Sequence, residues 1–225
     1  MGAARARASI AAWAEEAARS GYARSRVKER FYDALNGQFD RKGFGERRAR
    51  LVGGLEGDVL EIGAGTGLNV PHYRRARRVV ALEPDGAYGR RLRERAAAAG
   101  LPVEVVVGRA ESLPFPDESF DHAVTSIALC SVDDLDVALA EIRRVLRPGG
   151  SFVFLEHVRG DGHVGRWQDR LTPVQRRLAD GCHLNRDTES AIEQAGFRFE
   201  EIERFRLPAG HPLIKPAIQG RAAKL

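Results

Sequence analysis

The sequence predicts an α/β fold in which a doubly wound, mostly parallel sheet of seven strands follows a helical N-terminal arm. Two observations lead to this expectation. Short apolar runs alternate with helical segments between residues 59 and 196, a pattern typical of βαβ units, and the first run opens into a glycine-rich turn. With 225 residues, 43% of them hydrophobic, the chain is long enough for one such domain. We expect an arm or lid at residues 1–50 and a single domain at residues 51–225.

The arm is expected to be helical because of the spacing of its apolar residues. The segment Ile10–Ser20 is rich in alanine, and a second run places Val27, Phe31 and Leu35 on one helical face. Its other face is basic. Loops and one short helix are expected to follow: Asn36–Gly37 and Gly43–Gly45 as loops, and Arg47–Leu55 as the helix.

Five apolar runs are expected to be parallel strands: Val59–Ile62, Val79–Leu82, Val103–Val107, Asp121–Ser126 and Phe152–Leu155. The expected helices of the domain are Tyr88–Ala99, Asp134–Leu146, Val164–Ala179 and Thr188–Ala195. Asp133 or Asp134 should cap the second of these, and Pro173 should break the third. Two final strands, Phe197–Leu207 and Leu213–Ala222, should form an antiparallel pair at the edge of the sheet.

The formal net charge of +5 at first suggests a polyanionic partner. The charge is unevenly distributed, however. Residues 1–50 hold 12 basic and 6 acidic side chains, and this leaves 24 basic and 25 acidic residues for the rest of the chain. Because the domain is nearly balanced, we expect no nucleic-acid partner. Peripheral contact of the basic arm with a membrane surface is left open.

Several other classes of protein are excluded by composition. No run approaches the roughly 18 apolar residues that a membrane span needs, and the first ten residues lack the apolar core of a secretory signal. A cytoplasmic location is therefore expected, and a monomer or a homodimer. The two cysteines, Cys130 and Cys182, are too few for a disulfide framework and lack metal-ligand spacing, so we predict no metal site.

The strongest motif is a glycine-rich turn, V-L-E-I-G-A-G-T-G, at residues 59–67. Glycines there permit positive φ and let backbone N–H groups approach a ligand. The third glycine comes one residue earlier than in the dinucleotide fingerprint, so the loop does not match a pyrophosphate site. Glu83 ends the second strand, where a carboxylate can accept both hydroxyls of a ribose. A third segment, Gly108–Phe115, is placed to flank an adenine.

These motifs resemble those of class I S-adenosylmethionine (SAM)-dependent methyltransferases, which have a Rossmann-like fold. The resemblance covers residues 55–160 and rests on E-I-G-A-G-T-G, L-E-P, G-x-A-E-x-L-P-F-x-D-x-S-F-D and R-V-L-R-P-G-G. It implies SAM as the cofactor. It implies that the methionine end of SAM contacts Glu61, Gly63, Ala64, Gly65 and Gly67, the ribose Glu83, the base Pro84, Ala110 and Glu111, and the methionyl group Ser126. Arg109 stands where many relatives have an acidic residue.

Methyl transfer depends mainly on proximity and alignment, so little catalytic machinery is expected. The acceptor pocket should lie above the carboxyl ends of the fourth and fifth strands. There His157, at a strand end, and His183, in a glycine-containing loop, are the candidate bases. A structural role is the alternative for each histidine. Cys130 is a candidate for substrate binding, although small core residues are the common role of a lone cysteine.

A closer resemblance, over residues 55–222, is to the alkyl thiol S-methyltransferases and their bacterial relatives. It rests on L-C-S-V, E-H-V, Trp167 and D-G-C-H-L-N-R. It implies a small, fairly apolar acceptor, with a thiol favoured and with Trp167 among its contacts. N-, O- or C-methylation of a small metabolite, a quinone or a phospholipid is the alternative. A SAM-binding regulatory protein without turnover is the alternative of another class.

The arm allows two hypotheses. Its aromatic residues, among them Tyr32 as a substrate contact, would close over SAM and the acceptor and exclude water. Alternatively, its basic face docks the protein on a membrane surface.

Overall fold

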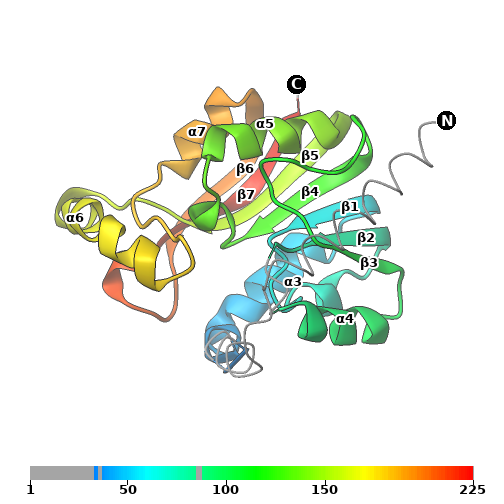
Figure 1. The fold of residues 1–225 in the computed structure, drawn as a ribbon, viewed down its shortest axis with the longest axis horizontal. Coiled ribbons are helices and arrows are strands. Elements are labelled where there is room, and N and C mark those ends of the chain that lie inside the picture. Colours follow the sequence, from blue (N-terminus) through cyan, green and yellow to red (C-terminus); the bar gives the residue numbers. More distant parts are fainter. Residues whose placement is uncertain (1–32, 35–36, 85–87, 225) are drawn as a thin grey trace.

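The computed structural model describes residues 33–34, 37–84 and 88–224 and contains one seven-stranded sheet. Its strands lie in the order β3-β2-β1-β4-β5-β7-β6 (Figure 1). The bounds are β1 Gly57–Ile62, β2 Ala76–Leu82, β3 Val103–Val106, β4 Phe120–Ser126, β5 Leu146–His157, β6 Phe197–Arg206 and β7 Pro216–Lys224. The predicted α/β fold with a mostly parallel sheet of seven strands is confirmed.

Strand direction changes at one strand alone. β3, β2, β1, β4 and β5 pair in parallel, whereas β7 is antiparallel to both β5 and β6. The antiparallel pair of the last two strands is confirmed, but the sequence did not predict that β7 inserts between β5 and β6. The order reverses between β1 and β4, and in open α/β sheets ligands bind at the carboxyl ends of the strands at such a switch point.

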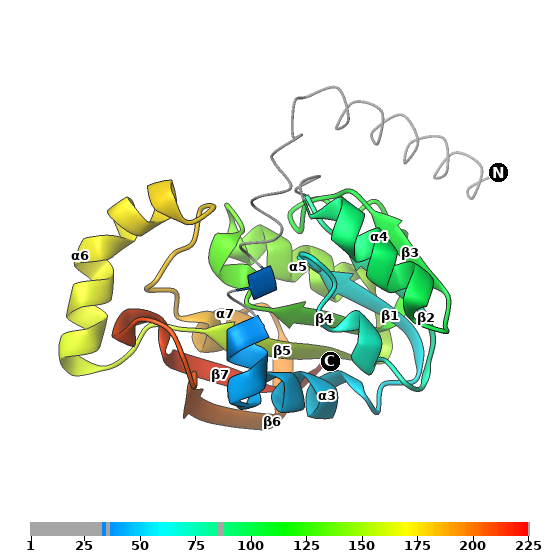
Figure 2. The ribbon, with the colours of Figure 1, turned by 90° about the horizontal axis from the view of Figure 1, so that it is seen from below.

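Helices cover both faces of the sheet (Figure 1). α3 and α4 lie on one face and α5 and α7 on the other, while α6 projects beyond the carboxyl end of β5 (Figures 1 and 2). The helical elements are η1 Asp40–Phe44, α3 Gly45–Val52, η2 Val70–His72, α4 Gly89–Ala98, η3 Leu129–Ser131, α5 Leu135–Val145, α6 Gly162–Leu178, α7 Thr188–Gln194 and η4 Pro212–Ile214. Asp134 caps α5, as predicted, by accepting from the N–H groups of residues 136 and 137.

The main core lies between the sheet and the α5–α7 layer. It contains Phe120, Phe152 and Phe154, all fully buried, together with Leu139 and Ile142 of α5. Phe197 of β6 packs on Phe152, with ring centroids 5.5 Å apart. Burying these large apolar side chains fixes the strands whose ends carry the site.

Two local expectations were wrong and one was right in part. The chain kinks at Lys42 and Gly43, which have non-helical φ and ψ angles (φ of Gly43 is 100°), whereas Gly45 already begins α3. Pro173 does not break α6, which runs from residue 162 to residue 178. β5 begins at Leu146, before the Pro148–Gly150 turn, and the register with β4 shifts there.

The described part of the chain includes no helix with the length and apolar character needed to cross a bilayer. Residues 1–32, which include Tyr32 and most of the predicted arm, lie outside the described residues. The part of the predicted arm that the structure describes packs on the domain, since Phe44 and Arg48 are buried. The boundary at residue 50 stays a prediction.

Candidate active site

The candidate site lies where the loops after β1 and β4 meet. Gly63 follows β1 with a φ of 67°, a conformation that favours glycine. A Cβ on Gly63 would lie 2.6 Å from the Cβ of Ala128, in the loop after β4. Two independent features therefore favour glycine at this position: its backbone conformation and the close approach of the two loops. Ile127 has a φ of 54°, a strained conformation for a β-branched residue beside this contact.

The glycine-rich turn is fastened to the end of β2. The N–H groups of Gly63 and Ala64 both donate to the carbonyl oxygen of Leu82, over 2.9 and 3.0 Å. The N–H of Gly65 donates to the carboxylate of Glu83 over 2.7 Å. Because these donors are already engaged within the protein, the turn differs from a phosphate cradle. It holds the largely buried Glu83 carboxylate at the end of β2, beside the turn after β1.

Beneath the turn lies a buried polar network around Glu61. Its carboxylate accepts from Asn69 Nδ2 over 2.9 Å and from the Tyr73 hydroxyl over 3.0 Å. Burial raises the pKa of the Glu61 carboxyl to about 7, although the bonds from Tyr73 and Asn69 and the Arg48 guanidinium oppose this. Asn69 Nδ2 also lies 3.0 Å from Ser126 Oγ, at the end of β4. The network thus joins two predicted SAM-binding residues.

Sequence reasoning missed Asn69, Tyr73 and Arg48. Arg48 is buried on α3, where it donates to Asn69 Oδ1 over 2.9 Å and pairs with Asp40 over 3.2 Å. For Asn69 and Tyr73 the one signal in the sequence was their place just after the glycine turn, whereas Arg48 lies before the turn and gave no signal. Nothing in their spacing indicated that they converge on Glu61.

The third predicted segment follows β3 and contacts the connection between η3 and α5. Ala110 is buried, and Glu111 is half-buried and accepts from the N–H of Asp133 over 2.6 Å. Arg109 pairs with Glu111 over 3.5 Å and also contacts Asp133. Arg109 is thus directed to acidic neighbours. Pro84 is exposed at the end of β2. The roles of these residues at an adenine stay predictions.

The acceptor side is formed by the loops after β4 and β5. Glu156 is fully buried near the end of β5, and both its oxygens lie 3.1 Å from the N–H of Ala128. Burial raises the pKa of the Glu156 carboxyl. Arg186 donates to the carbonyl oxygens of Leu129 and Val132. A carboxylate and a guanidinium therefore both hold the backbone at and next to η3.

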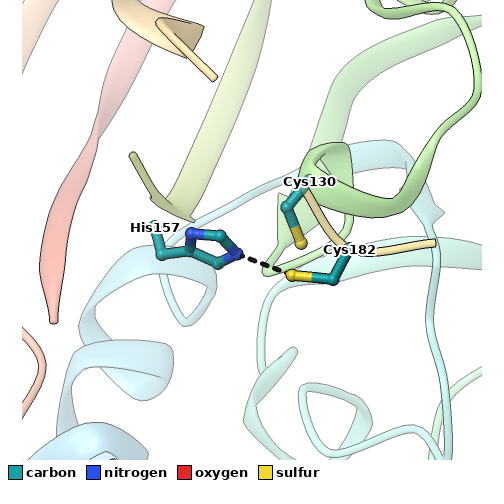
Figure 3. Close-up of side chains that lie close together, drawn as sticks. All are labelled: Cys130, His157 and Cys182. Atoms are coloured by element: carbon teal, nitrogen blue, oxygen red, sulfur yellow. Dashed lines mark hydrogen bonds between the residues drawn. The ribbon is translucent and has the colours of Figure 1, made fainter. Parts of the chain in front are cut away.

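Three side chains converge on this side of the site (Figure 3). His157 Nε2 lies 3.3 Å from Cys182 Sγ, and Cys130 Sγ is beside them. Cys130 and His157 are each 3% exposed, and Cys182 is half-buried. The pKa of the Cys182 thiol is raised, mainly by its hydrogen bond with Cys130 and to a smaller extent by burial. The structure thus brings together Cys130 and His157, which are both predicted site residues. Cys182, which lies between them, was not predicted as a site residue.

The remaining predicted residues are less enclosed. His183 is half-buried, with its Nδ1 3.1 Å from the carbonyl oxygen of Cys130 and 3.2 Å from Arg186. Trp167 is 52% exposed on α6, beneath the Arg170 guanidinium. Their catalytic and substrate-binding roles stay predictions.

The donor set fits a cationic nucleoside. Carboxylates at Glu61 and Glu83 border the glycine turn, and acidic groups suit a sulfonium, an ammonium group and ribose hydroxyls rather than phosphates. The N–H groups of Gly63, Ala64 and Gly65 are engaged with Leu82 and Glu83, as described above. These residues therefore match the SAM site that the sequence motifs imply.

Comparison with known proteins agrees with this geometry. Residues 60–154 match the family model of a methyltransferase domain. The human thiol S-methyltransferase TMT1A is 36% identical over 171 residues, which cover 74% of this chain and 70% of that protein. A phosphatidylethanolamine N-methyltransferase from Cereibacter sphaeroides is 36% identical over 169 residues, 73% of this chain and 80% of that protein.

A solved structure shares the architecture. A SAM-dependent methyltransferase from Thermotoga maritima, described as a possible histamine N-methyltransferase, superposes with a TM-score of 0.63 at 26% identity. The match covers 88% of this chain and 97% of that one. The two proteins therefore share the overall architecture.

Proposed function

The chain belongs to the SAM-dependent methyltransferases, and from this premise we propose that it transfers the methyl group to the sulfur of a small, fairly apolar thiol. The observation that carries the proposal is the 36% identity with the human thiol S-methyltransferase over 171 residues. That similarity is longer than the methyltransferase domain at 60–154. It therefore extends into parts of the chain outside the domain that all methyltransferases of this type share.

When bound, SAM supplies a methyl group activated by a sulfonium. The acceptor's sulfur attacks the methyl carbon as the bond to the sulfonium breaks, which yields a thioether and S-adenosylhomocysteine. The thiol proton leaves to water or to a base. An ordinary thiol has a pKa of about 8.5, so its thiolate is accessible near neutral pH without strong general-base catalysis. The protein's main task is then alignment.

We assign the cofactor to the glycine turn and its acidic neighbours. Glu83 would hold the ribose hydroxyls, and Glu61 would face the ammonium group from beneath the turn. Support comes from the bond between Gly65 and Glu83 and from the buried network of Glu61 with Asn69. The acceptor would enter above η3 and the end of β5, where Cys130 and His157 lie. The base roles of His157 and His183 remain predictions.

The proposal is tested by incubating the protein with methyl-labelled SAM and a panel of small thiols, amines and phenols. We expect label on apolar thiols. Label on an amine or a phenol with none on a thiol would overturn the proposed acceptor. SAM binding without transfer to any acceptor, including a broad cell extract, would favour the regulatory alternative.

A phospholipid amine is the second candidate acceptor. The bacterial phosphatidylethanolamine N-methyltransferase has the same percentage identity, 36%, over 169 residues, although the thiol S-methyltransferases from human, rat and mouse make up the larger group of relatives. In addition, α6 exposes apolar side chains at helical spacing, namely Trp167, Leu171, Val174 and Leu178. Vesicles containing phosphatidylethanolamine belong in the same panel. Labelled lipid without labelled thiol would select this candidate.

A further inference from the structure

Cys130, His157 and Cys182 form a compact cluster of soft ligands. They come from three segments that are far apart in sequence: η3, the end of β5, and the connection between α6 and α7. The ligand atoms, two sulfurs and one imidazole nitrogen, all lie within 4.8 Å of one another (Figure 3). Figure 3 shows that the three side chains point toward one another from separate elements.

The backbone holds the cluster in place. The N–H of His183 donates to the carbonyl oxygen of Cys130 over 2.8 Å, which fixes Cys182 beside η3. Arg186 fastens the same η3 through the carbonyl oxygens of Leu129 and Val132. His157 is held by the pairing of β5 with β7, where it lies opposite Ala217. The ligands are therefore preorganised by groups that are not themselves ligands.

The spacing is suited to a tetrahedral cation. With Zn–S near 2.3 Å and Zn–N near 2.0–2.1 Å, tetrahedral angles separate two sulfurs by about 3.8 Å and a sulfur from a nitrogen by about 3.6 Å. The 3.3 Å between His157 Nε2 and Cys182 Sγ lies close to the second value. All three distances between the ligand atoms are at most 4.8 Å, which is compatible with both the sulfur–sulfur and the sulfur–nitrogen separation.

We propose that Cys130, His157 and Cys182 bind a zinc ion through Sγ, Nε2 and Sγ. Thiolates and a neutral imidazole are ligands that zinc prefers, and two thiolates balance its charge within a buried site. Three protein ligands leave a fourth position open, as in catalytic rather than structural zinc sites. A histidine that holds the ion through Nε2 is not the general base that the sequence suggested.

The fourth coordination position of the zinc could bind the acceptor thiol, a role that rests on the proposed function. An acceptor thiol that binds there loses its proton to solvent and forms a sulfur–zinc bond, because a coordinating thiol is deprotonated. Two of the ligands, Cys130 and His157, lie after β4 and at the end of β5, at the same edge of the sheet as the glycine turn after β1. The zinc would then present a thiolate on the side of the site assigned to the acceptor.

Metal binding is tested on the full chain, reduced and freed of reductant and of metal, and titrated with Co²⁺. We expect one Co²⁺ per chain, with the sulfur-to-cobalt charge-transfer band and the strong visible absorption of a tetrahedral site. Zn²⁺ should displace it. Cys130→Ser, Cys182→Ser and His157→Ala should each weaken binding by about 100-fold or more, since the affinity of a zinc site is shared among its few ligands.

His163→Ala, which removes an exposed histidine on α6, is the matched control and should bind Co²⁺ like the wild type. The proposal is overturned if folded wild type gives no charge-transfer band, or if Cys182→Ser binds Co²⁺ with the affinity and the band intensity of the wild type. A disulfide between Cys130 and Cys182 that persists after reduction would also overturn it. The thiol-labelling assay is separate: Co²⁺ binding without any labelled thiol leaves the metal site standing and rejects the proposed acceptor.

Discussion

The N–H of Gly65 donates to the Glu83 carboxylate over 2.7 Å, which couples the glycine turn to the end of β2. Replacing Glu83 by alanine should weaken SAM binding by roughly tenfold or more, because a charge-assisted hydrogen bond is worth about 1.5–3 kcal/mol. Glu83→Gln keeps one acceptor oxygen and should lose less. Isothermal titration calorimetry with SAM measures both.

The control for Glu83 is Glu104→Ala, which removes an exposed carboxylate from the neighbouring strand β3. It should leave the affinity for SAM unchanged. If Glu83→Ala melts like the wild type and still binds SAM with the same affinity, Glu83 is not the ribose ligand.

Gly63 and Gly100 offer a comparison in which backbone conformation is nearly constant. Their φ values are 67° and 70°, but a Cβ on Gly63 would lie 2.6 Å from Ala128 Cβ, whereas a Cβ on Gly100 meets no atom within 4 Å. Gly100→Ala should cost about 1–2 kcal/mol from its left-handed conformation alone. Gly63→Ala should cost about 1–3 kcal/mol more, because the two loops must separate.

Urea unfolding of the two glycine variants measures this difference, and titration with SAM reports whether the site is displaced. We expect Gly63→Ala, and not Gly100→Ala, to lose affinity. Equal destabilisation of the two variants would show that the close approach between the loops after β1 and β4 contributes nothing.

How far the sequence predicts this site depends on how local each feature is. The glycine turn and the Asp134 cap follow from short-range rules and were predicted from the chain. His157 and Cys182 lie 25 residues apart, and their contact depends on where the connection after α6 returns to the sheet. No periodicity in the sequence encodes that path. The insertion of β7 between β5 and β6 was missed for the same reason.

The R-V-L-R-P-G-G motif shows a second limit. Its first arginine, Arg144, was used as a sign of family, but its physical role is to hold the segment after β3 by hydrogen bonds. It donates to the carbonyl oxygens of Leu113 and Phe115 over 3.1 and 2.8 Å and pairs with Glu141. Glu141 in turn accepts from the N–H of Leu113. The motif thus fixes the segment that carries Ala110 and Glu111, a relationship visible only in three dimensions.

Glu61 should make stability fall as the pH rises. Its folded-state pKa is about 7, against an ordinary value of 4.5. Between these values the folded state binds more protons than the unfolded state, so the free energy of unfolding decreases with increasing pH, by about 3 kcal/mol at most. Glu61→Gln removes this dependence and should be more stable than the wild type above pH 7 when no SAM is bound.

Urea unfolding of both proteins at pH 5 and pH 8 checks the sign. The difference between the two pH values should be smaller in Glu61→Gln, whereas Glu104→Gln should keep the wild-type difference. A wild type that gains stability over this range, with Glu61→Gln following it, would contradict a raised pKa at Glu61.

Asp33 gives the arm hypothesis a physical starting point. Its carboxylate accepts from Thr66 Oγ1 in the glycine turn over 2.6 Å and pairs with Arg95 of α4 over 3.1 Å. The chain that follows the undescribed residues 1–32 is therefore fastened to the predicted cofactor site. If the arm closes over that site, deleting residues 1–32, which include Tyr32, should lower kcat/KM by roughly tenfold or more, because closure excludes water and completes alignment. Asp33→Ala should give part of that loss.

Glu200→Ala, an exposed carboxylate on β6, is the control for Asp33. The truncated protein must also melt like the full chain for the comparison to hold. The docking hypothesis predicts a different pattern. The truncated protein should keep full turnover on a soluble acceptor but lose its binding to anionic vesicles. The full chain should bind those vesicles less tightly as salt rises, because surface charges are screened. A truncated protein with both full turnover and full vesicle binding would reject both roles, since each requires the arm's aromatic or basic residues.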